Sequence, residues 1–269
     1  MPSRAFALLT AVLLAVPAVA CGAATEADQL RLRSSAETGD LRAMRGLAAR
    51  LLETGQTAAA EEAGDWLAAA VDQGDAEAMH QLACLRFSGR DGQRDFRAAV
   101  SLWQAAASLG HADAMYNLAV CYRDARGTFR SALRASMWFR LAAEQGQVEA
   151  MTAWGRCLFD GVGTQYDEQA ATEWWTRAAR AGEVEAMVAL AVAAQTGRGL
   201  PRDDRAAAGW WRRAADAGNR AAMVVLAAHY EVGRGLQQDA QAASTWYRQA
   251  RRAETPATVA GGLVLALPE

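Results

Sequence analysis

Residues Gly110–Met115 read GHADAM, and this glycine, followed by three variable residues, alanine and methionine, is the phrase that decides the fold. The same phrase occurs at Gly39–Met44, Gly74–Met79, Gly110–Met115, Gly146–Met151, Gly182–Met187 and Gly218–Met223. Successive methionines are separated by 35 residues once and by 36 residues four times. A period this constant indicates a stacked array of small units, because one such unit cannot bury its apolar face alone.

Each phrase is predicted to open the first helix of a unit. Its glycine suits the left-handed backbone that ends the preceding helix, and the next residue, such as Asp75, suits a helix N-cap. Apolar residues then follow at spacings of three and four, which places them on one helix face. A glycine turn such as Gly161–Gly163 ends this helix. The third unit keeps only Gly127, and the second has Gly89 and Gly92 in a shifted pattern, so these two turns are expected to be less regular.

A second helix is predicted to start at Asp95, Ser131, Asp167, Asp203 and Asp239, because aspartate and serine cap free backbone N–H groups. Most of these helices carry an aromatic pair: Trp138-Phe139, Trp174-Trp175, Trp210-Trp211 and Trp246-Tyr247. Alanines flank each pair, so large rings are expected to pack against small residues. Burying one tryptophan is worth at most about 4–6 kcal/mol by its area. The aromatic column is therefore interpreted as core; the alternative is a platform for a ligand.

In these columns the chain resembles the Sel1-like repeat, a relative of the tetratricopeptide repeat, from Asp40 to about Glu254. The resemblance implies an all-α fold, a right-handed α-solenoid of about six two-helix repeats with an N-terminal capping helix. It also implies a concave face lined by the first helices. Arg86, Leu158 and Ala194 stand where the family tends to have tyrosine, so looser packing is expected there.

The chain is predicted to divide into an export signal peptide (1–20), an N-terminal tether and capping helix (21–39), six repeats (40–254) and an apolar C-terminal tail (255–269). Leu30 is expected to be the main apolar contact of the capping helix. Arg4, an apolar run and Ala18-Val19-Ala20 form the signal pattern. Cys21 follows directly and resembles a bacterial lipid-attachment site. Either Cys21 is diacylated, giving a membrane-anchored lipoprotein, or it is the first residue of a soluble periplasmic protein.

Two surface features suggest where a partner binds. An acidic row begins the first helices, which is explained by helix-dipole complementation or by an electronegative rim for a basic segment. In the last two repeats, the first helix is apolar nearly all round. Either the tail Thr258–Leu267 or a partner is therefore expected to cover these two helices. The predicted lipidation residue is Cys21, and the predicted partner-binding residues are Glu77, Asp113, Tyr116, Glu149, Glu185, Val188, Val192, Val224, Val225 and Ala228.

Other functional classes have less in their favour. A formal net charge of −2 gives no basic footprint for nucleic acid. His80, His111 and His229 stand in unrelated columns, and none is expected to have a cysteine or carboxylate at metal-ligand spacing. No cofactor, metal or catalytic residue is predicted. The resemblance implies a non-enzymatic protein-binding scaffold of the bacterial cell envelope; the alternative is a cell-wall enzyme active on peptidoglycan or β-lactams.

Overall fold

The computed structural model describes residues 28–253, and Cys21 and Thr258–Leu267 lie outside them. All the regular structure in this range is helical, as predicted. The chain forms two compact units, which divide between Asp95 and Phe96. None of the helices over these residues combines the length and apolarity needed to traverse a bilayer.

The first unit contains a helical segment over residues 28–37, followed by α2 (Leu41–Glu53), α3 (Thr57–Asp72) and α4 (Ala76–Ser88). α2 packs on α3, and α3 packs on α4. The prediction for Leu30 is wrong, because this side chain is 68% exposed; Ala36 is buried instead. The irregular second helix of the first repeat is longer than the others, at 16 residues, and its N-cap residue makes no side-chain capping bond.

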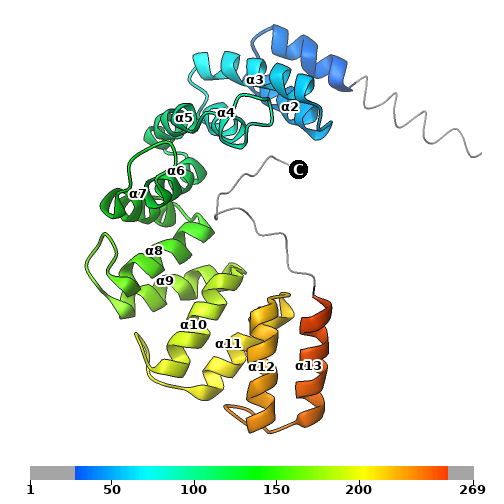
Figure 1. The fold of residues 1–269 in the computed structure, drawn as a ribbon. Coiled ribbons are helices and arrows are strands. Elements are labelled where there is room, and N and C mark those ends of the chain that lie inside the picture. The colour runs from blue at the N-terminus through cyan, green and yellow to red at the C-terminus, as the bar shows by residue number, and fades with distance from the viewer. Residues whose placement is uncertain (1–27, 254–269) are drawn as a thin grey trace, which may run out of the picture. The chain divides into compact units, whose positions relative to one another are not determined.

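The second unit is a regular stack in which each helix packs on the next one in the chain (Figure 1). Its helices are α5 (Phe96–Ser108), α6 (Ala112–Asp124), α7 (Ala132–Glu144), α8 (Val148–Asp160), α9 (Glu168–Arg180), α10 (Val184–Thr196), α11 (Asp204–Asp216), α12 (Arg220–Val232) and α13 (Ala240–Arg252). Even-numbered helices are the first helices of the repeats, and odd-numbered helices are the second.

Helix ends follow the predicted chemistry. The side chain of Asn219 accepts a hydrogen bond from the backbone N–H of Ala222, and Asp203 caps α11 in the same way. The expectation of a less regular third turn is wrong: Ala125 adopts the left-handed conformation, with φ of 60°, where other repeats have glycine. An alanine tolerates this conformation at a cost in strain, so the turn geometry is set by the stack rather than by glycine alone.

The two rings of an aromatic pair differ in how deeply they are buried. The second ring is buried in three of the four pairs, at Phe139, Trp175 and Trp211, whereas Tyr247 is only partly buried. The first ring is partly exposed, and arginines lie over two of these rings: Arg177 over Trp174 at 4.1 Å and Arg213 over Trp210 at 4.8 Å. Adjacent helical residues point about 100° apart, so the two rings of a pair face different directions. The prediction that the whole aromatic column is core is wrong for the first ring.

The positions at which looser packing was expected, Arg86, Leu158 and Ala194, are well packed. Ala194 is 1% exposed and Leu158 is 8% exposed, so neighbouring groups cover both smaller side chains. Arg86 forms an ion pair with the buried carboxylate of Asp91. Two cavities lie at other positions on α8 and its neighbours.

A backbone contact joins successive repeats of the second unit. The second glycine of each turn, Gly163, Gly199 or Gly235, lies so close to the first residue of the preceding repeat's second helix that a Cβ atom would overlap its carbonyl oxygen. The hydroxyl of Ser136 also donates a hydrogen bond of 2.6 Å to the carbonyl oxygen of Gly163. Thr172 and Gly199 repeat this bond at 3.1 Å. We call this contact the turn latch.

The turn latch predicts a difference between two glycines that both have positive φ. Gly163→Ala should lower the free energy of unfolding by about 3–5 kcal/mol, because backbone strain and a collision with Ala132 add together. Gly182→Ala is the matched control: its φ is also positive, but a Cβ there meets nothing within 4 Å. It should cost only about 1–2 kcal/mol. Chemical denaturation measures both; equal costs would contradict the latch.

Candidate functional site

An open cavity of about 540 Å³ lies in the second unit between α8, α9 and α10. We call it the valine groove, and its lining residues are Arg156, Phe159, Asp160, Trp175, Glu185, Val188, Ala189, Val192 and Asn219. The apolar residues form most of the wall, and the charged residues stand at both sides. Cavities of this size with a few polar groups are typical of binding sites.

Three of the predicted partner-binding residues line this groove. Val188 and Val192 lie one turn apart on α10, and Glu185 precedes them in its first turn. Val192 is 42% exposed, whereas Leu190 beside it is buried. The sequence pattern identified these valines because they fall off the buried stripe of a helix that has almost no polar residues.

The remaining apolar candidates lie elsewhere. Val224, Val225 and Ala228 are on α12 and do not line the valine groove. Val224 is 43% exposed, and the other two are half-buried. The tail that was expected to cover them lies outside the described residues, as does Cys21.

Sequence reasoning missed the other half of the groove wall. Phe159 stacks against Trp175 with ring centroids 5.1 Å apart, and the guanidinium of Arg198 lies 4.0 Å from the centre of the Phe159 ring. These residues come from α8, α9 and the turn after α10, which no periodic column connects. The signals in the sequence were an aromatic residue at position 159, near the end of a first helix, and Trp175, which the repeat pattern assigned to the core.

Part of the predicted acidic row forms a group of interacting carboxylates at the starts of α8 and α10. Glu149 and Glu185 are exposed in the first turns of α8 and α10, and Glu183 is the N-cap of α10. The pKa of the Glu183 carboxyl is raised, first by its burial and then by the negative charges of Glu149 and Glu185. Asp113 begins α6 and is half-buried. We call Glu149, Glu183 and Glu185 the acidic cluster.

Two of the predicted partner-binding residues, Tyr116 and Glu77, are not part of the acidic cluster. Tyr116 is 6% exposed and packs against Phe139, with ring centroids 5.6 Å apart. Burial raises its pKa to about 12, and the charges of the acidic cluster contribute to the rise. Tyr116 therefore supports the fold and does not present a contact surface. Glu77 belongs to the first unit, where it accepts a hydrogen bond of 2.9 Å from Gln81.

Each of the three histidines contacts groups of the protein itself. The expectation that none has a cysteine nearby is wrong, since Nε2 of His80 lies 3.6 Å from Sγ of Cys84, one turn further along α4. His111 caps α6, and His229 is buried beside the carbonyl oxygen of Arg234. Within residues 28–253, no group of three or more histidine, cysteine or acidic residues could hold a metal ion.

The acidic cluster predicts a pH-dependent change in stability. A raised carboxyl pKa means that ionising Glu183 costs the folded state more than the unfolded chain, so this cost appears as pH rises above 4.5, the ordinary pKa. Glu183→Gln should therefore raise the denaturation midpoint at pH 7, and the gain should vanish near pH 3.5. Glutamine is the natural cap at the equivalent position, Gln147. A gain that is the same at both pH values would rule out charge repulsion as its cause.

Solved structures are similar to this chain over most of its length. A protective antigen present in uropathogenic Escherichia coli strains is 29% identical, with a TM-score of 0.79 over 83% of this chain and 48% of that one. This chain therefore spans about half the length of the E. coli protein. A Sel1 repeat protein from Oxalobacter formigenes is 26% identical, with a TM-score of 0.66 over 72% of this chain and 83% of that one. The search of curated proteins found no match.

The family comparison matches six consecutive segments. The Sel1 repeat model matches residues 41–75, 76–111, 112–147, 148–183, 184–219 and 220–254. Each matched segment contains one first helix and the second helix that follows it. Sel1 repeat proteins generally mediate interactions between proteins. The chain belongs to the Sel1 repeat family.

Proposed function

We propose that this protein is a non-enzymatic scaffold whose valine groove binds a short partner segment containing apolar residues and a basic residue. The observation that carries the proposal is the groove itself: about 540 Å³ of space beside Val188 and a half-exposed Val192. Each apolar side chain that a partner buries there contributes about 1.5–3 kcal/mol. The family membership supports a protein as the occupant.

The acidic cluster supports a basic residue in the bound segment. Three carboxylates at the starts of α8 and α10 repel one another, which is the cause of part of the pKa rise of Glu183. A lysine or arginine of the partner would relieve this repulsion while forming charge-assisted hydrogen bonds. Glu185 belongs both to the cluster and to the groove, so the two features are adjacent. Nothing in the described residues favours the alternative of a peptidoglycan or β-lactam enzyme.

The groove proposal predicts the effect of one charged substitution. A phage-displayed library of random nine-residue peptides should yield binders that combine leucine-like residues with lysine or arginine. Val192→Arg should weaken these binders about tenfold or more, because it fills the apolar wall with a solvated cation. Val232→Arg is the control, since Val232 is 72% exposed and lies away from the groove lining. Equal affinity for Val192→Arg and the unchanged protein would refute the proposal.

We also propose that the scaffold works in the cell envelope. The support is the sequence of residues 1–21, with its arginine, apolar run and Ala18-Val19-Ala20 before Cys21. Lipid on Cys21 would tether the groove to a membrane, whereas simple cleavage would release the protein into the periplasm.

The envelope proposal predicts a mature protein that begins at Cys21. Mass spectrometry of the protein isolated from bacteria should show loss of residues 1–20. A further mass of a diacylglyceryl group identifies the lipoprotein, and Cys21→Ala should then remove the protein from the membrane fraction. An unprocessed Met1 in the mature protein would contradict export.

A further inference from the structure

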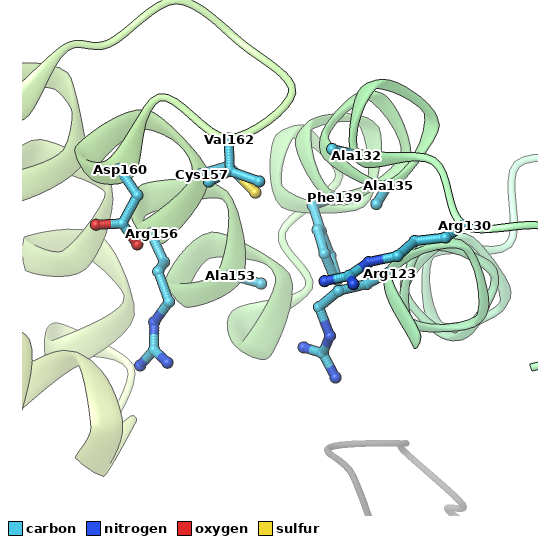
Figure 2. A pocket seen from close by; sticks show the side chains of 10 residues that line it. All are labelled: Arg123, Arg130, Ala132, Ala135, Phe139, Ala153, Arg156, Cys157, Asp160 and Val162. Carbon is cyan, nitrogen blue, oxygen red and sulfur yellow. The ribbon is translucent and has the colours of Figure 1, made fainter. Parts of the chain in front are cut away.

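A second cavity of about 240 Å³ opens in the second unit between α6, α7 and α8 (Figure 2). We call it the arginine pocket, and its lining residues are Arg123, Arg130, Ala132, Ala135, Phe139, Ala153, Arg156, Cys157, Asp160 and Val162. Neither the repeat pattern nor the groove proposal accounts for it. It adjoins the valine groove, because Arg156 and Asp160 line both cavities.

The pocket has a cationic rim. Figure 2 shows Arg123 and Arg130 extending from the α6 and α7 side of the opening, and Arg156 extending from α8 on the other side. Arg123 pairs with Asp124 at 2.7 Å. Over residues 28–253, neither Arg130 nor Arg156 has an ion-pair partner, and both are exposed. Three guanidinium groups thus face a pocket whose lining contains one carboxylate, that of Asp160.

The floor of the pocket is apolar. The buried ring of Phe139 closes the base of the pocket, and the half-exposed Val162 stands at its edge (Figure 2). Cys157 adds a neutral group, because burial raises the pKa of its thiol to about 11. No anion on the floor therefore offsets the rim at neutral pH.

We propose that the arginine pocket binds an aspartate or glutamate of the partner segment, with a neighbouring apolar side chain of that segment packed on the half-exposed Val162. Guanidinium groups match carboxylates in geometry as well as charge, and they bind them by charge-assisted hydrogen bonds. Val162 adds apolar contact area that a free anion cannot use. The proposal rests on the proposed function, since it adds an acidic residue to the segment bound in the adjoining groove.

The two sites give the bound segment a fixed polarity. The acidic cluster lies at the N-terminal ends of α8 and α10, whereas the rim arginines come from the C-terminal halves of α6 and α8 and from the loop before α7. A segment with a basic residue at one end and an acidic residue at the other matches both charges in one direction only. Electrostatic matching of this kind determines specificity and register more than total affinity.

The test uses synthetic nine-residue peptides that share two leucines and a lysine and differ at one position, which is aspartate, glutamate, asparagine or glutamine. The acidic peptides should bind at least about fivefold more tightly than their amides at low salt, and the preference should shrink as salt is added. Arg130→Glu should abolish the preference. Arg205→Glu, an exposed arginine on α11 outside the pocket lining, is the matched control and should leave it unchanged. Circular dichroism checks that each variant folds.

The outcomes separate this inference from the proposed function. Equal binding of acidic and amide peptides, or a preference that survives Arg130→Glu, would overturn the arginine pocket while the groove stands. Competition by inorganic phosphate as strong as that by the acidic peptide would identify a simple anion site and also overturn it. A preference that survives Val192→Arg, with overall affinity unchanged, would support the pocket and refute the groove. Failure of every peptide to bind would refute both.

Discussion

The regular part of the stack depends on one interaction, the burial of one large ring in each of the second helices α7, α9 and α11. Trp175 shows how this works in detail. Its indole Nε1 donates a hydrogen bond of 3.1 Å to the carbonyl oxygen of Thr152, and its ring lies against Gly155, where a side chain would collide with it. Because the ring brings apolar area and its N–H group is hydrogen-bonded, α8 and α9 approach closely without leaving the buried indole N–H unpaired.

The same packing leaves part of the first helices open. The rings occupy the side of α8 and α10 that faces the second helices, so the residues on other sides are available for contact. Valines on α10 and arginines on α6 and α8 occupy these positions, and they make two adjoining cavities of opposite character. The regular register of the repeats also brings the acidic N-termini of successive first helices together, which is why like charges accumulate at Glu149, Glu183 and Glu185.

Much of the fold could be read from the sequence because it is local. Helix starts, left-handed ends and the buried stripe depend on spacing within one repeat, and Asn219 and Gly161 behave as the pattern indicates. The exposed valines of α10 were also foreseeable from the absence of a polar face. By contrast, periodicity alone could not separate Trp174 from Trp175, since both residues repeat every 36 positions. The side that each ring faces depends on the angle between helices.

The candidate site was less predictable, because its parts come from different repeats. Tyr116 was among the predicted partner-binding residues, yet it is buried and packs against Phe139. The arginine pocket joins Arg123, Arg130 and Arg156, which occupy different columns of the repeat. Only the stacking of α6, α7 and α8 brings them together, so no motif could have identified them.

The turn latch has a consequence for how such a chain changes length over evolutionary time. Its two partners are a glycine without a side chain and a carbonyl oxygen that every residue possesses. Neighbouring repeats therefore need no matched pair of side chains at this joint, and a duplicated segment carries a complete connector at each end. Gain or loss of a whole unit by recombination preserves the joint, while the surface residues of the new unit remain free to diverge toward a different ligand.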